Sequence, residues 1–138
     1  MTHSYLGIQP TLYGFDSSPG SITLSTSYYV QKMFATNKGD TILPVQSSTK
    51  FGPVYWVASK KDSQYFVKLA NYGSVLQSVT VNVAGTAKGK IEMLAGGQYQ
   101  GNKPHDMRIE PVTTNVNSTD GSYLVEMEPW SVAVLAVR

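Results

Sequence analysis

The chain has 138 residues, no cysteine and a formal net charge of +2 at pH 7. That length suits one domain with a hydrophobic core, and the missing cysteines exclude disulfides and thiolate metal sites. Only 14% of the residues are charged and the lysines do not form a stripe, so nucleic-acid binding has little support. The sequence contains no apolar run of the roughly 18–20 residues that a membrane span needs. Residues 1–7 lack the charged start and apolar core of a signal peptide.

The first 39 residues predict a connector followed by one helix. Residues 1–24 are interrupted by prolines and glycines and predict an irregular or short-strand segment. Residues 25–36 have helical periodicity, with a serine or threonine available to cap the start and a left-handed stop predicted at residues 37–39. A helix this short is not stable alone in water, so we expect it to dock on another surface. Its apolar stripe consists of Tyr29, Val30, Met33 and Phe34.

The rest of the chain, residues 40–138, predicts a mainly β domain, an antiparallel β-sandwich of about seven or eight strands. Its clearest strand alternates Val79, Val81 and Val83 with polar residues, which is typical of a half-buried strand. No internal repeat is visible. The expected strands are residues 41–45, 54–60, 64–71, 78–84, 90–95, 107–113, 122–128 and 131–138.

The last expected strand, residues 131–138, is apolar on both faces. Val132, Val134 and Ala136 alternate with further apolar side chains. A sandwich strand usually buries one face only, so something else must cover the other face, and we expect that cover to come from outside these 138 residues. This pattern indicates that the chain is one part of a larger protein.

Three segments, in order along the chain, carry a family resemblance. They are residues 25–34 with the following Gly39-Asp40 and Leu43-Pro44, residues 52–59 with residues 65–73, and residues 130–137. The first resembles the closing helix of the (β/α)8 barrel in family-51 glycoside hydrolases, the α-L-arabinofuranosidases. The others resemble the C-terminal domain of these enzymes, especially in fungal members. The similarity extends from about residue 8 to the end of the chain.

This resemblance implies that residues 1–39 end a barrel and that residues 40–138 form a C-terminal β-sandwich. The parent enzyme would remove arabinofuranosyl side chains from arabinoxylan or arabinan in hemicellulose and would be secreted. The family's catalytic glutamates, an acid/base and a nucleophile on barrel strands four and seven, lie upstream of the matching region. We therefore expect no catalytic residue here and no activity from this chain alone.

Among the nine carboxylic residues, Glu126 and Glu128 form the best candidate pair. Two residues apart on one strand face, they are separated by about 6.6 Å, beyond the roughly 5–5.5 Å of a retaining glycosidase. A solvated strand face explains them better. No metal or cofactor site is expected, because His3 and His105 are isolated and residues 85–89 lack the ending of a phosphate loop.

The remaining candidates concern sugars. Trp56 and Trp130 could stack on a sugar ring, but both lie within apolar patterns that favour core packing. Tyr99, in a glycine-rich loop, is a better candidate for an exposed aromatic. Asn117 begins an N-glycosylation sequon, Asn-Ser-Thr, which is meaningful if the parent is secreted.

The sequence thus predicts a non-catalytic sandwich that stabilises a catalytic barrel, with the stripe Tyr29, Val30, Met33 and Phe34 buried against it. The alternative from another class is a free-standing carbohydrate-binding module for plant cell-wall polysaccharide. A flat row of exposed aromatics would favour the module, and a broad apolar face would favour the docking domain. With such a face uncovered, we expect the isolated chain to self-associate.

Overall fold

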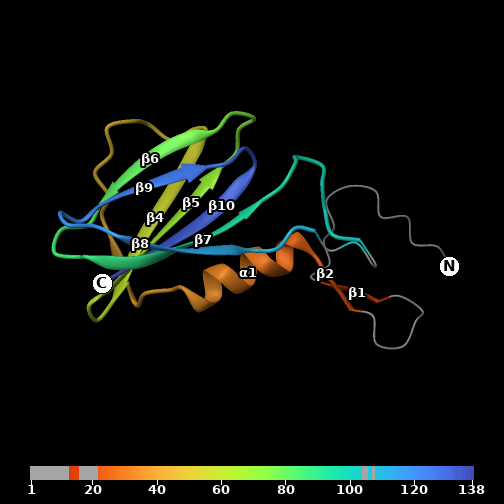
Figure 1. The fold of residues 1–138 in the computed structure, drawn as a ribbon, viewed down its shortest axis with the longest axis horizontal. Helices are drawn as coiled ribbons and strands as arrows, with labels where there is room; N and C mark the ends of the chain where they lie inside the picture. Colours follow the sequence, from red (N-terminus) through yellow and green to blue (C-terminus); the bar gives the residue numbers. More distant parts are fainter. Residues whose placement is uncertain (1–12, 16–21, 104–105, 107) are drawn as a thin grey trace.

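The computed structural model describes residues 13–15, 22–103, 106 and 108–138. It is mainly antiparallel β with one helix, so the expected β-sandwich is confirmed (Figure 1). No helix among these residues is long and apolar enough to cross a membrane. The elements are β1 (Tyr13–Phe15), β2 (Ile22–Leu24), α1 (Thr26–Thr36), β3 (Thr41–Leu43), β4 (Val54–Lys61), β5 (Gln64–Asn71), β6 (Gln77–Asn82), β7 (Lys88–Ala95), β8 (Val112–Asn117), β9 (Ser122–Met127) and β10 (Ser131–Val137).

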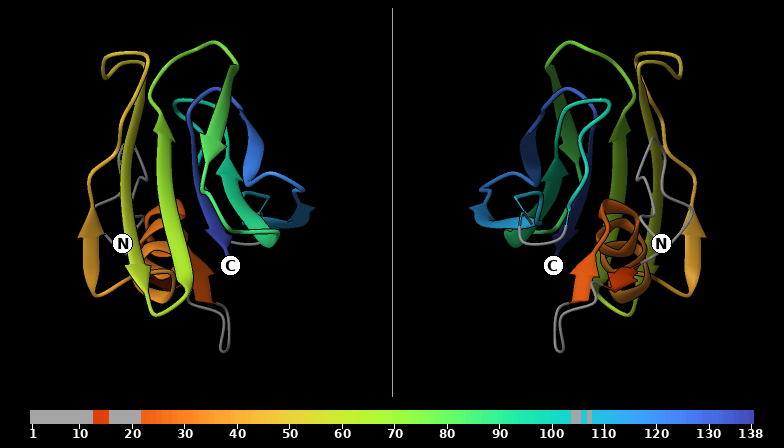
Figure 2. Two further views of the ribbon diagram at one scale, coloured as in Figure 1. Left: turned by 90° about the vertical axis from the view of Figure 1, so that its left-hand side faces the viewer. Right: turned by 90° about the vertical axis from the view of Figure 1, so that its right-hand side faces the viewer.

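A six-stranded antiparallel sheet forms the middle of the molecule, in the order β3-β4-β5-β10-β7-β8. The two-stranded sheet β6-β9 covers one face and α1 covers part of the other, which gives three layers (Figure 1). The edge strands β3 and β8 lie on opposite sides of the molecule (Figure 2). A separate ribbon of β1 and β2 leads into α1.

The central position of β10 explains its two apolar faces. It pairs with β5 on one side and β7 on the other, so its backbone is fully enclosed within the sheet. Ala133 and Leu135 face the β6-β9 sheet and join the main core, whereas Val134 faces α1. The expectation that the cover of the second face comes from outside the chain was therefore wrong: the chain's own helix covers it.

The main core lies between the two sheets. Val125 and Met127 of β9 have no exposed surface and pack against the inner face of the larger sheet. Their outward neighbours Leu124 and Glu126 are exposed, which is the strict alternation of a strand with one face in the core. Burying such apolar side chains contributes about 1.5–3 kcal/mol each.

Helix α1 begins where the sequence predicts but ends differently. Ser25 caps its start, accepting a hydrogen bond from the Tyr28 backbone N–H at 3.2 Å. The predicted left-handed stop is wrong, because Asn37 has φ −112° and its side chain instead donates to the Met33 carbonyl at 2.9 Å. Gly39 follows for another reason: a side chain there would collide with the Lys60 backbone.

One expected strand is misplaced. The strand expected at residues 107–113 lies at Val112–Asn117. Only Val116 of this strand reaches the main core, so the segment carries little apolar alternation to locate it. Ile109, which lies within the expected range, belongs to a loop and packs under α1.

Candidate functional site

Several carboxylates of the described residues hold local structure together. Glu126 and Glu128 are exposed on β9 and just after it, which confirms the solvated face. Glu110 accepts a hydrogen bond from the Tyr29 hydroxyl at 3.1 Å, and Glu92 accepts one from the Asn37 side chain at 3.1 Å. No group of three or more acidic, histidine or cysteine residues within the described part of the chain could hold a metal ion. His3 and His105 lie outside the described residues.

Asp120 illustrates a carboxylate used in a turn. It accepts hydrogen bonds from the Ser122 backbone N–H and the Ser118 hydroxyl, both at 2.9 Å. The first of these, followed by the second, holds the pKa of Asp120 below its usual value. The ionised carboxylate therefore fixes the turn between β8 and β9.

The two tryptophans occupy different environments. Trp56 is half-buried and packs against the main core, as predicted. Trp130 instead lies in the turn before β10, with φ +54°, and meets Tyr72 edge-on at an interplanar angle of 88°. Perpendicular rings do not present one flat platform for a sugar. Tyr99 is exposed, as expected.

The predicted stripe on α1 packs against the sandwich of this same chain. Tyr29 and Met33 are buried against Leu94 and Val134 on the outer face of the large sheet. Val30 and Phe34 lie at the margin of this contact and remain partly exposed.

Polar contacts hold both ends of α1 to the rest of the chain. Near its C-terminal end, Lys68 of β5 donates to the Phe34 carbonyl at 2.9 Å, satisfying one of the carbonyls that a helix end leaves unpaired. Burial, and then the charge of Lys38, lowers the pKa of Lys68. Near the start of α1, the buried Asn102 side chain bridges the Leu24 carbonyl and the Ile109 backbone at 2.8–3.0 Å.

An uncovered apolar area lies on the α1 side of the sheet. Trp56 and Ala58 of β4 point into the core. Because side chains alternate along a strand, Tyr55 and Val57 point to the opposite face, where they are 49% and 46% exposed. Phe51 lies at the edge of β4, with its ring centroid 5.7 Å from that of Tyr55 and 4.3 Å from that of Trp56, and it is 60% exposed. We call Phe51, Tyr55 and Val57 the β4 patch. Tyr55 and Val57 were not predicted as site residues, although the apolar character of both faces of β4 was the available signal.

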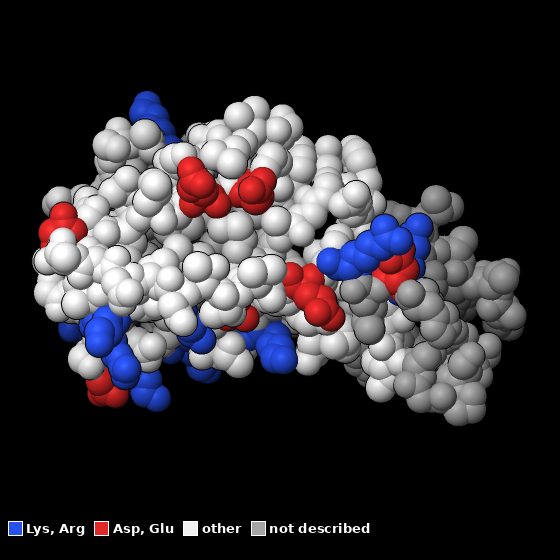
Figure 3. Space-filling view, in the orientation of Figure 1, with Lys and Arg blue, Asp and Glu red and all other residues white. Residues whose placement is uncertain are grey.

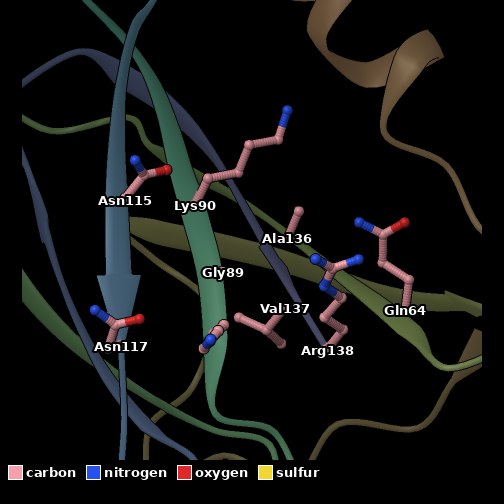
Figure 4. A pocket seen from close by; sticks show the side chains of 9 residues that line it. Gln64, Gly89, Lys90, Asn115, Asn117, Ala136, Val137 and Arg138 are labelled. Carbon is pink, nitrogen blue, oxygen red and sulfur yellow. The ribbon is translucent and has the colours of Figure 1, made fainter.

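A shallow hollow of about 500 Å³ lies at the other end of the same face, near the C-terminus. Side-chain amides and cations surround it, among them Gln64, Lys90, Asn115 and Arg138 (Figure 4). The hollow is open to solvent, and none of the residues that line it is acidic.

The face seen in Figure 3 is mostly uncharged, with basic side chains gathered along the margin where α1 lies.

These features define a class: a β-sandwich domain backed by one helix, with an apolar patch beside that helix. Residues 8–131 match the family described as the alpha-L-arabinofuranosidase C-terminal domain. The chain belongs to this family, as the sequence resemblance predicted.

Relatives and solved structures agree with this family assignment. The probable alpha-L-arabinofuranosidase A of Emericella nidulans is 49% identical over 97% of this chain, and alpha-L-arabinofuranosidase A of Aspergillus niger is 47% identical over 94%. The chain spans only 25% and 21% of their lengths. The structure of the arabinose-bound MgGH51 α-L-arabinofuranosidase matches with TM-score 0.82 and 31% identity, over 94% of this chain and 21% of that one. The chain thus corresponds to a non-catalytic C-terminal part of a family-51 α-L-arabinofuranosidase.

Proposed function

We propose that this domain packs against the catalytic barrel of a family-51 α-L-arabinofuranosidase and stabilises it. The parent would act on arabinofuranosyl side chains of hemicellulose and arabinan outside the cell. The relatives support this role, because this chain corresponds to a quarter or less of their length and leaves ample chain for a barrel.

In this proposal α1 is the closing helix of the barrel. Its contact with the sheet is then the part of the barrel–sandwich interface that this chain contains, and Tyr29 and Met33 are the residues that join the two. Val30 and Phe34, at the margin of that contact, extend it towards the remaining barrel surface.

The observation that carries the proposal is the β4 patch. Its two strand residues, Tyr55 and Val57, lie on the same face as α1, and its three apolar side chains are about half exposed or more. Exposed apolar side chains grouped beside a structural helix are typical of an interaction surface. The barrel that would contain α1 is the partner best placed to cover them, because it is attached at this face.

Binding of the chain to a separately produced catalytic part of the Emericella nidulans relative tests the proposal. We expect binding, and we expect the double variant Tyr55→Ser, Val57→Ser to weaken it about tenfold or more, since truncating an apolar side chain at the centre of an interface costs about 1 kcal/mol or more. Leu124→Ser is the matched control, because Leu124 is 58% exposed on the outer face of the opposite sheet. Equal weakening by the control variant, or no binding at all, would contradict the proposed role.

A further inference from the structure

We propose that Asn117 carries an N-linked glycan that shields the free edge of β8. Asn117 is the only one of the six asparagines that begins an Asn-x-Ser/Thr sequon, and the middle residue, Ser118, is not proline. The proposal rests on the extracellular location proposed above, because N-glycans are added to exported chains.

The folded chain leaves this asparagine accessible. Asn117 is the last residue of β8, and its exposed side chain makes no hydrogen bond to any described residue. Because Val116 faces the core, Asn115 and Asn117 project from the opposite face of the strand (Figure 4). Asn117 borders both the hollow near the C-terminus and a second open hollow of about 330 Å³ beside the sequon. A sugar attached to the side-chain nitrogen therefore has space on either side.

Hydrogen bonds fix the backbone around the sequon, and none of them involves the side chains of Asn117 or Thr119. The Ser118 N–H donates to the Ala87 carbonyl at 2.9 Å, and Asp120 holds the turn that follows. The Thr119 side chain is exposed and, like that of Asn117, has no hydrogen-bond partner among the described residues. Attachment of a glycan would thus break no contact of the folded chain.

The free edge of β8 could pair with a strand of another chain, so it is a place where shielding would prevent association. β8 is the terminal strand of the large sheet and pairs only with β7 among the described strands, so it presents unpaired backbone groups along six residues. Proteins usually blunt such edges with charged residues, proline, bulges or short strands. The opposite edge strand, β3, has three residues, whereas β8 is longer and its sequence, Val-Thr-Thr-Asn-Val-Asn, contains no charge or proline.

The position also agrees with barrel docking. Asn117 and the β4 patch lie on the same face, but β5, β10 and β7 separate β4 from β8, a distance of about 19 Å at roughly 4.8 Å per strand. Helix α1 packs on β10 and β7, between the two. A glycan on β8 therefore leaves the β4 patch open to a partner.

Export of the chain from a yeast tests occupancy of the site. We expect the wild-type chain to carry one glycan, seen as a single mass shift that peptide N-glycosidase removes. Asn117→Gln and Thr119→Ala are expected to lose this shift. Thr119→Ser, which keeps the sequon, and Asn115→Gln, which makes the same side-chain change outside the sequon, are expected to retain it. An exported wild-type chain that unfolds cooperatively in urea and carries no glycan would overturn the proposal.

Light scattering tests the shielding role. At equal concentration, glycan-free Asn117→Gln is expected to associate faster than Asn115→Gln, which keeps the glycan, at matched stability in urea. Equal rates would overturn the shielding role. Both experiments are independent of barrel binding, so a chain that is glycosylated but does not bind the barrel would contradict only the proposed function.

Discussion

At the scale of single residues, buried side-chain amides organise the loops of this domain. The side chain of Asn71 donates to the carbonyls of Val75, Met127 and Glu128 at 2.9–3.2 Å and accepts from the Gly73 N–H at 3.1 Å. It thereby joins the end of β5 to the turn before β10. Asn102 does the same where the loop after β7 meets β2. These two roles could not be predicted, because an asparagine in an exposed turn and one that is buried and holds two loops together look the same in a sequence.

Asn71→Ala is expected to destabilise the domain by about 2–4 kcal/mol, because it leaves buried carbonyls without donors. Asn71 is only 2% exposed, so water cannot replace the lost amide without rearrangement. Urea unfolding measures the change, and Asn82→Ala, at an exposed position at the end of β6, is the matched control. A cost for Asn71→Ala no larger than that of the control would show that the network contributes little.

At the scale of elements, the pattern of apolar residues predicted most strands and the helix, and its failures have identifiable causes. β5 and β9 were placed within a residue of their bounds because burial on one or both faces enforces a strong pattern. β8 was misplaced because an edge strand with one inward residue needs little apolar character. The cover over β10 could not be predicted, because periodicity gives α1 an apolar stripe without specifying the surface that receives it. The β4 patch was missed because the apolar residues on both faces of β4 signal that both faces are covered, without showing which one this chain leaves exposed.

The attachment of α1 predicts a specific pH dependence. Burial of Tyr29, and then its hydrogen bond to Glu110, raises the pKa of its hydroxyl above the ordinary value of 10.0. As the pH rises, the unfolded chain therefore loses this proton before the folded chain does. The stabilising contribution of Tyr29 is complete below about pH 10 and is lost as the pH rises through the raised pKa.

Tyr29→Phe removes this titrating group while keeping the ring against Met33. The variant is expected to lose less stability than the wild-type chain between neutral pH and the pH range above 10, as measured by urea unfolding. Lys68, whose pKa is lowered, shifts stability in the opposite direction, but it does so in both chains and cancels in the comparison. Identical alkaline losses in the two chains would show that the hydroxyl of Tyr29 does not couple folding to pH.

At the scale of the whole molecule, the two faces of the six-stranded sheet are covered to different extents. The β6-β9 sheet closes one face around the main core, while α1 covers only the middle of the other. The β4 patch on one side of α1 is apolar, and the margin around Asn117 on the other side is polar. This asymmetry fits a domain that meets a large partner along one side of its helix and solvent along the other. Self-association of the isolated chain is then expected through the β4 patch and not through β10, which is covered.

Hydroxyl-radical footprinting tests the central claim most directly. The isolated chain is compared with the same chain joined to the catalytic part of the Emericella nidulans relative, and oxidation of each aromatic side chain is measured by mass spectrometry. The docking account predicts that Tyr55 and Phe51 become protected in the joined protein. Tyr99, which is exposed in the loop after β7, is expected to react equally in both. Unchanged oxidation of Tyr55 and Phe51, with the joined protein folded and active, would contradict the claim that the β4 patch faces the barrel.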